Sequence, residues 1–236
     1  MCSKTQLLLL LALGAGSHGF TIHHQKYGQV RESRLQAAPT SIEELFADAS
    51  QWDPIKNELD QVPVFACAND ESQPLQYNVG DKPMAFFFLD IDAAKAELEK
   101  AKTDTDMDGL QLVPFPLGEI FIMGTKEMAL VVPPAQGIVD AGAPPGTNPL
   151  GQQVPLFGCM DVEQDLGDGT SMTPLFTTMG EAKDAMNMAL EGLEDKSKFD
   201  VTVIPLAQAI QMQASTPEKK FTYVPSESSL KYLRDM

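Results

Sequence analysis

The residues that could do chemistry in this chain are few and poorly placed for it. All three histidines lie near the N-terminus, at His18, His23 and His24. If that segment is removed, as its composition indicates below, the mature chain has no histidine. Ser-His-Asp catalysis, Cys-His catalysis and His-ligated metal sites are then excluded together. We therefore expect no catalytic residues and no enzymatic activity.

The mature chain keeps two cysteines, Cys67 and Cys159. No C-x-x-C spacing occurs, which excludes a thioredoxin-type redox site and a zinc knuckle. The two thiols could pair across a pseudo-twofold axis. They could also stay separate as small buried apolar side chains, the commoner place for a free cysteine. The second arrangement is the one we expect.

Two acidic loops imitate binding loops without completing them. Asp104–Gly109 has the oxygen ligands of the first half of an EF-hand, but Phe115 stands where the twelfth position requires Glu. Asp165–Gly169 is glycine-rich but lacks the lysine of a phosphate-binding loop. We therefore expect solvated turns, with no metal and no cofactor.

The elements around these residues follow an internal repeat. Val62–Cys67 reads VPVFAC, and Val154–Cys159 reads VPLFGC. Further landmarks recur in the same order, at offsets between 89 and 92 residues. The matched landmarks are Pro83 with Pro174, Pro116 with Pro205, and Val131–Pro133 with Tyr223–Pro225. This pattern predicts a duplicated chain.

Apolar periodicity gives each half the same series of elements. A helical lead-in over 40–59 is expected to restart at Asp53-Pro54, with the Asp as N-cap. We expect strands over 62–68, 84–89, 110–113, 129–132, 154–160, 174–176, 201–205 and 223–225, and helices over 90–101, 116–123, 134–141, 178–193, 205–212 and 226–235. The predicted fold class is α/β, more closely α+β. Two pseudo-twofold-related β-β-α-β-α-β-α halves form one body with an apolar cleft.

The N-terminal residues are typical of targeting segments. An apolar run over Leu7–Leu13 after Lys4 predicts a signal peptide over 1–19, since a membrane span needs roughly 20 apolar residues. The basic, acid-poor segment 20–38 is typical of a transit peptide, and a short secretory propeptide is the alternative. The rest divides into a lead-in and first half-repeat over 40–142, a Pro/Gly linker over 143–153 and a second half-repeat over 154–236.

The charge excludes another class of function. The whole chain carries a formal net charge of −16. Removal of residues 1–38 takes four of the 17 basic residues and one of the 33 acidic ones, which leaves a charge near −19. Such a chain has no basic face for nucleic acid. The charge favours solubility and attracts basic partners, a class that includes transit peptides.

Binding through hydrophobic surface is then the class of function that remains. Seven of the twelve methionines lie between residues 154 and 236, and methionine is common on adaptable binding surfaces. From the predicted strands and helices, the candidates for lining a client-binding cleft are Phe65, Phe87, Phe121, Phe157, Phe176 and Ile210.

Residues 40–236 resemble the Tic-twenty-two-like family. The resemblance lies in four features in order: the VPVF strand, the Phe-rich strand before a capped helix, the Val113–Leu117 turn (VPFPL) and the Leu130–Pro133 strand (LVVP). It implies a soluble protein of the plastid envelope intermembrane space with a pseudo-symmetric fold and hydrophobic clefts. It also implies chaperone-like binding of unfolded preproteins or transit peptides, translocon components as partners, and no direct membrane insertion.

The leader agrees with such a location. A signal peptide, then Phe20, then a transit-like segment resembles the bipartite presequences of algae with complex plastids, which are reached through the secretory pathway. The competing hypothesis is a secreted or lumenal protein whose two halves close on a small apolar ligand.

Overall fold

The computed structural model describes residues 20–22, 42–105, 107–165, 171–216 and 220–236. The predicted signal peptide over 1–19 and residues 23–38 of the transit-like segment lie outside this set. So do Asp106 of the EF-hand-like loop and residues 166–169 of the glycine-rich loop. No described helix is long and apolar enough to cross a membrane.

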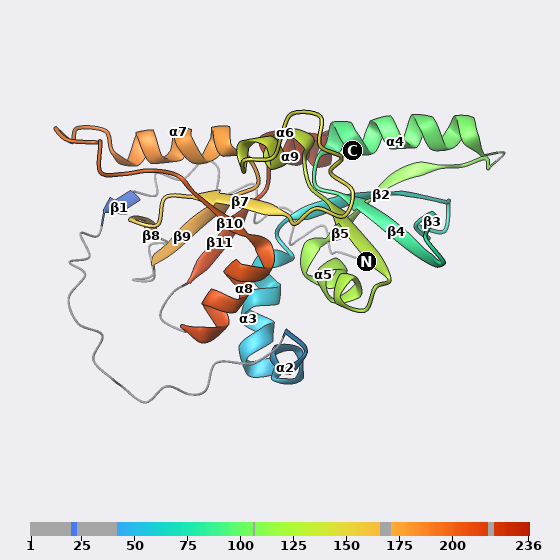
Figure 1. The fold of residues 1–236 in the computed structure, drawn as a ribbon, viewed down its shortest axis with the longest axis horizontal. Coiled ribbons are helices and arrows are strands. Elements are labelled where there is room, and N and C mark those ends of the chain that lie inside the picture. The colour runs from blue at the N-terminus through green and yellow to red at the C-terminus, as the bar shows by residue number, and fades with distance from the viewer. Residues whose placement is uncertain (1–19, 23–41, 106, 166–170, 217–219) are drawn as a thin grey trace.

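Two β-sheets lie side by side in the middle of the molecule (Figure 1). One has the order β3-β4-β2-β5, with β6 parallel to β4. The other has the order β1-β8-β9-β7-β10, with β11 parallel to β9. The remaining pairs in both sheets are antiparallel. The strands are β1 Phe20–Ile22, β2 Pro63–Ala68, β3 Gln76–Val79, β4 Lys82–Phe88, β5 Gln111–Pro116, β6 Ala129–Val132, β7 Pro155–Gly158, β8 Val162–Asp165, β9 Ser171–Phe176, β10 Thr202–Pro205 and β11 Phe221–Val224.

Helices cover both faces of the two sheets (Figure 1). The upper layer holds α4, α6, α7 and α9, and the lower layer holds α2, α3, α5 and α8. Their bounds are α2 Ile42–Ala47, α3 Ala49–Leu59, α4 Ile91–Asp104, α5 Leu117–Thr125, α6 Ala135–Asp140, α7 Met179–Ala189, α8 Leu206–Ser215 and α9 Glu227–Asp235. The predicted α+β class with two repeated halves is confirmed.

Equivalent hydrogen bonds establish how the halves correspond. Leu117 N donates to Val62 O at 3.0 Å, and Leu206 N donates to Val154 O at 2.8 Å. Each bond ties the start of a lower helix to the start of the opening strand. In the upper layer, Leu89 N donates to Val132 O at 3.1 Å, and Thr177 N donates to Val224 O at 3.2 Å.

Strand register corrects one of the predicted landmarks. Phe65 pairs with Phe88, and Phe157 pairs with Phe176, so Phe88 is the counterpart of Phe176. Pro174 therefore corresponds to Phe86, and its match to Pro83 was wrong. Pro83 lies further back, opposite Asn78 in the β3–β4 hairpin. The landmark at Pro116 and Pro205 holds, because they pair with Pro63 and Pro155.

Each half also contains a short strand beyond the predicted series. β3 and β8 precede the longer strands β4 and β9 as hairpin partners, so the half-repeat is β-β-β-α-β-α-β-α. Their sequences, QYNV and VEQD, are polar and only four residues long. Such segments carry too little apolar alternation to be recognised as strands.

The lead-in breaks earlier than predicted. The second helix starts after Asp48, whose side chain accepts hydrogen bonds from Ser50 N at 3.0 Å and from Gln51 Nε2 at 3.0 Å. Pro54 lies inside α3 and does not mark its start. The restart at Asp53-Pro54 was therefore wrong, because Asp48 satisfies free N–H groups of the first turn that Asp53 cannot reach.

The last helix of each half lies over the other half. In α9, Ser229 Oγ donates to Leu89 O at 3.3 Å, and the Tyr232 ring meets Phe65 edge-to-face at 5.5 Å. In α6, Gly137 lies against the second half, where an added Cβ would be 3.7 Å from Pro155 Cγ. The two halves therefore form one body with exchanged covering helices.

One hydrophobic cluster runs through both halves. It joins side chains from α3, β2, β4 and α5 to side chains from β7, β9, β10, α8 and β11. Two smaller clusters lie under the upper helices, one in each half. Every member of the three clusters lies between residues 45 and 233. Residues 39–236 therefore contain every described member of the three clusters.

Candidate functional site

Four of the six predicted cleft residues lie in the core. Phe65, Phe87, Phe157 and Ile210 are each 0% exposed. Phe65 and Phe157 are equivalent residues of the two opening strands, and each lies under an upper helix. A side chain without exposed surface contacts no outside molecule in this conformation. Their role in client binding stays a prediction, one that requires the body to open.

The other two predicted residues, Phe121 and Phe176, are half-buried. The Phe121 ring lies 6.2 Å from Phe46 and 6.3 Å from Trp52, and those two rings are 4.6 Å apart. This three-ring group lies on the lower side, where α2, α3 and α5 meet. Phe176 packs beside Met179 and Met186 under α7. The six residues therefore do not form one surface.

The lead-in helix α3 fills the space between the halves on the lower side. It packs between α5 and α8, the equivalent helices of the two halves (Figure 1). Trp52, Ile55 and Leu59 are its buried residues, and Leu59 is 0% exposed. Each such side chain contributes about 1.5–3 kcal/mol on burial. The predicted cleft between the halves is thus occupied by the protein's own helix.

Gly118 on α5 allows this close packing. A Cβ at Gly118 would lie 3.0 Å from the backbone oxygen of Lys56 on α3. The equivalent residue on α8 is Ala207, which already carries the Cβ that Gly118 lacks. On the same side, Lys56 Nζ lies 2.5 Å from Asp60 Oδ2 and 3.8 Å from Glu119 Oε1.

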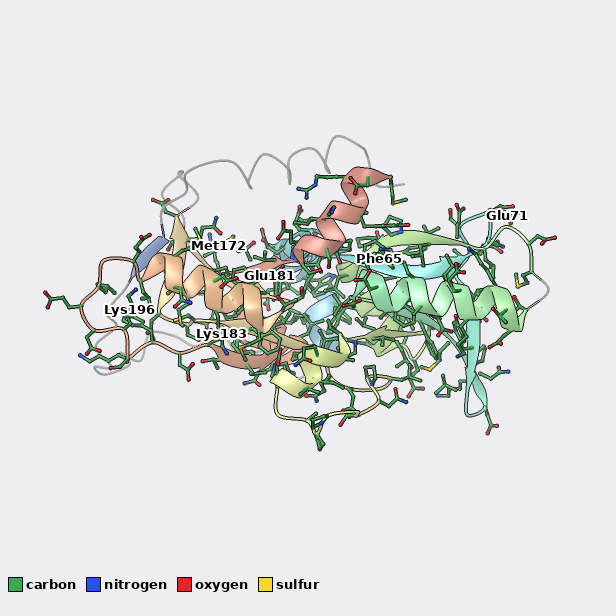
Figure 2. All side chains as sticks on the ribbon, turned by 90° about the horizontal axis from the view of Figure 1, so that it is seen from above. Phe65, Glu71, Met172, Glu181, Lys183 and Lys196 are labelled. Atoms are coloured by element: carbon green, nitrogen blue, oxygen red, sulfur yellow. The ribbon has the colours of Figure 1, made fainter. Side chains whose placement is uncertain are left out.

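The upper side has a cavity of about 500 Å³ at the junction of the halves. Its residues come from the starts of α4 and α7 and from α6. Figure 2 labels Glu181, which lies near the centre of the molecule at the inner end of α7. The cavity is lined by Asp90, Pro134, Gln136, Gly137, Asp140, Thr177, Thr178, Gly180, Glu181 and Asp184.

Two carboxylates of this cavity, Asp90 and Glu181, accept hydrogen bonds from backbone N–H groups at helix starts. Asp90 Oδ1 accepts from Ala93 N at 2.7 Å and caps α4, while Thr178 Oγ1 accepts from Glu181 N at 3.3 Å and caps α7. Glu181 Oε1 accepts from Glu227 N at 2.7 Å at the start of α9. No lysine or arginine is among the described lining residues. The described lining of this cavity is therefore negatively charged.

Both cysteines of the body are free and buried. Burial, and then the carboxylate of Glu97, raise the pKa of the Cys67 thiol to about 11. Burial likewise raises the pKa of Cys159. Both thiols are protonated at neutral pH, and only a thiolate is a strong nucleophile. The expected packing role of the two cysteines is confirmed.

The possible metal ligands and the methionines of the second half do not come together in one site among the described residues. No group of three His, Cys, Asp or Glu side chains that could hold a metal ion occurs among the residues that the structure describes. Of the methionines in the second half, Met188 on α7 is 68% exposed, whereas Met179 and Met186 pack beneath the helix. These methionines do not form a continuous apolar face.

Comparison with known proteins finds matches among solved structures. No protein-family model matches the chain, and no curated protein matches it. Among solved structures, Tic22 from Plasmodium falciparum superposes with a TM-score of 0.61 at 20% identity, over 77% of this chain and 96% of that one. This chain has the Tic22 fold.

A second solved Tic22 agrees. The Tic22 of Anabaena, described as a protein of protein transport, gives a TM-score of 0.63 at 18% identity, over 78% of this chain and 97% of that one. Nearly the whole of each solved Tic22 is therefore represented here. The structural resemblance expected from the order of motifs is confirmed.

Some features of the site were not predicted from sequence. The filling of the inter-half space by α3 was missed, although the buried stripe of Trp52, Ile55 and Leu59 is visible as helical spacing. The acidic cavity was missed because its residues come from segments up to about ninety positions apart. The helix starts predicted at residues 90 and 178 are confirmed, with Asp90 and Thr178 as the N-caps.

Proposed function

We propose that this protein is a plastid protein-import factor. It binds unfolded preproteins or their transit peptides, in a chaperone-like way, between the outer and inner envelope translocons. The observation that carries the proposal is the Tic22 fold over 96–97% of two solved relatives, one of them described as a transport protein. The predicted presequence and the charge near −19 of the mature chain support it, because transit peptides are basic.

A binding role fits the chemistry of the described residues better than catalysis does. The cysteines are buried and protonated, and two carboxylates of the cavity at the junction accept hydrogen bonds from helix-start N–H groups. The alternative of a secreted or lumenal carrier of a small apolar ligand finds less support. The space between the halves on the lower side is filled by α3, which packs between α5 and α8.

The chaperone-like activity is tested with the fragment 39–236, which contains every described member of the three hydrophobic clusters. A several-fold excess should reduce light scattering by an aggregating, chemically unfolded client. Phe121→Ala combined with Phe176→Ala should weaken the effect, while Met188→Ala, at an isolated exposed residue, should not. Circular dichroism checks that each variant is folded. No reduction of scattering by the parent fragment would contradict the proposal.

The location is tested separately. A fluorescent fusion to residues 1–40 should reach the plastid in an algal host. Secretion of the fusion would contradict the predicted transit function and would favour the alternative carrier.

Use of the predicted cleft requires α3 to move, because Phe87 and Ile210 lie in the cluster that α3 closes. Trp52 on α3 is the single tryptophan of the chain, and it is 5% exposed. Quenching of its fluorescence by acrylamide therefore reports the position of α3. Increased quenching on addition of client supports the cleft. Unchanged quenching together with suppressed aggregation would assign binding to another surface.

A further inference from the structure

The outer edge of β8 carries a strand from a distant part of the chain. β8 pairs with β9 on its inner side through Gln164 opposite Met172 and Asp165 opposite Ser171. On its outer side it pairs with β1, in antiparallel register. The opposed residues are Phe20 with Gln164, Thr21 with Glu163 and Ile22 with Val162. This pairing does not arise from a hairpin, because about 140 residues separate the two strands in sequence.

The equivalent edge in the first half has a different environment. β3 pairs with β4 over four residues, from Gln76 opposite Ala85 to Val79 opposite Lys82. Among the described residues, no strand lies on the other side of β3. Gln76, Asn78 and Val79 are exposed there. The duplicated fold therefore offers two equivalent edges, and the N-terminal segment pairs with only one of them.

The sequence at the β8 edge suits a segment without acidic residues. Asp161, Glu163 and Asp165 alternate along it, and Ser171 Oγ donates to Glu163 Oε2 at 2.5 Å from the neighbouring strand. Phe20–Ile22 is uncharged, combines an aromatic residue with two β-branched ones, and is followed within four residues by Lys26. Such residues favour extended pairing, and the alternating acids favour a basic chain.

We propose that the outer edge of β8 binds an extended segment of a client presequence by antiparallel strand addition. In the precursor, the protein's own Phe20–Ile22 covers this edge, and its removal makes the edge available. The inference rests on the proposed function for the identity of the occupant. Main-chain hydrogen bonds supply the affinity in such complexes, and side chains on alternate residues supply the specificity.

Covalent attachment explains why the edge is closed in the precursor. A segment on the same chain acts at an effective concentration on the order of millimolar, far above that of a micromolar peptide. Each main-chain hydrogen bond makes only a small net contribution, because it replaces a hydrogen bond to water, so a pairing of three residues is weak between separate molecules. The edge therefore suits brief contacts with a passing chain.

The register is tested by cysteine crosslinking in the full chain, with Cys2→Ser throughout. Thr21→Cys with Glu163→Cys places thiols on directly opposed residues, where Cβ atoms lie about 4.5–5.5 Å apart. Mild oxidation should give an intramolecular disulfide, seen as a gel shift. Thr21→Cys with Asn78→Cys, on the exposed edge of β3, is the matched control. Equal crosslinking in both pairs would overturn the assignment of β1 to β8.

Binding of a separate segment is tested with a fluorescent peptide of residues 17–28. Adjacent residues of a strand point their N–H groups to opposite sides. Thr21→Pro with Ile22→Pro in the full chain therefore removes the N–H donor that faces β8, whichever of the two residues carries it. This variant should bind the peptide at least ten-fold more tightly than the parent chain, as measured by fluorescence anisotropy. Gln29→Pro with Val30→Pro is the control, and it should behave like the parent.

Two outcomes of the binding test would overturn the proposal. One is equal affinity for all three chains. The other is undiminished binding of a peptide that itself carries the two prolines. This test needs no aggregating client and no plastid. Failure of the aggregation assay with success here would therefore reject the chaperone-like function and retain the edge as a peptide site.

Discussion

At the scale of single residues, the duplicated halves differ where packing is tightest. Gly158 of β7 stands where β2 has Ala66, which is buried. A Cβ on Gly158 would lie 2.7 Å from the backbone oxygen of Pro174 and 2.7 Å from Leu175 Cδ2. The oxygen belongs to the backbone of β9 and cannot turn away as a side chain could. The glycine is thus a steric requirement of the second sheet.

We expect Gly158→Ala to lower the free energy of unfolding by about 1–3 kcal/mol, the usual cost of an overpacked core. Gly180→Ala is the matched control, because no atom lies within 4 Å of the Cβ it would add. The control should leave the stability unchanged or raise it by up to about 1 kcal/mol, since alanine favours the helix. Urea unfolding of both variants measures the difference. A loss of stability in the control alone would contradict the steric explanation.

Titration of the Cys67 thiol makes the stability of the folded protein depend on pH in the alkaline range. Its pKa in the folded protein is about 11, above the ordinary value of 9.0, because burial disfavours the thiolate. A group with a raised pKa contributes stability that is complete below its unfolded pKa and is lost as pH rises through its folded pKa. We therefore expect the protein to lose stability between about pH 9 and pH 11. Cys67→Ala should lose less over this window in urea titrations, and parallel curves would contradict the assignment.

At the scale of elements, side-chain caps fix where the upper helices begin. Asp90 and Thr178 are equivalent N-caps beside the junction of the halves. Asp90 binds the free Ala93 N–H, which would otherwise lack a partner within the helix. Both caps belong to the lining of the acidic cavity. Both side chains thus fix helix starts, and Asp90 also adds negative charge to that region.

Asp90→Ala should cost about 0.5–2 kcal/mol of stability through loss of this cap. Asp92→Ala, in the same helical turn, removes an exposed carboxylate that lies 3.1 Å from Lys95 Nζ, and should cost no more than about 0.5 kcal/mol. Thermal unfolding followed by circular dichroism compares the two variants. An equal loss in both would indicate that charge near the helix start matters and the cap does not.

At the scale of the whole molecule, α3 completes the core that two half-repeats leave open. Its residues join the large cluster that contains side chains from both sheets. It contacts α5 of the first half and α8 and β11 of the second. The lead-in is therefore an integral part of the fold.

Leu59→Ala should lower the stability by about 2–5 kcal/mol, because Leu59 is 0% exposed and its removal leaves a cavity. Trp52 fluorescence and far-UV circular dichroism should report the same transition, since α3 packs on both halves. Lys126→Ala, at the end of α5, is a control of small expected effect. A separate early Trp52 transition in the parent protein would contradict the integral role of α3.

Most elements could be predicted from the sequence, whereas the arrangement of the site could not. Capped helices such as the one after Asp90 and apolar strands such as Met84–Leu89 carry local signals. The internal repeat provides an equivalent segment in the other half, which supports the prediction of each element. Burial of Phe65 and Ile210 depends on α9 and α3, which approach from remote parts of the chain. Periodicity identifies an apolar residue, but it does not say which other element will cover it.

The exchange of α6 and α9 between halves has the geometry of a domain-swapped dimer whose two subunits are one polypeptide. Neither half keeps its own last helix: Tyr232 of the second covers Phe65 of the first, and Gly137 of the first lies against Pro155 of the second. A half expressed alone would expose the strand that its partner's helix protects. Two separately expressed halves, cut within 143–153, should therefore be insoluble apart and reconstitute the fold by complementation when refolded together.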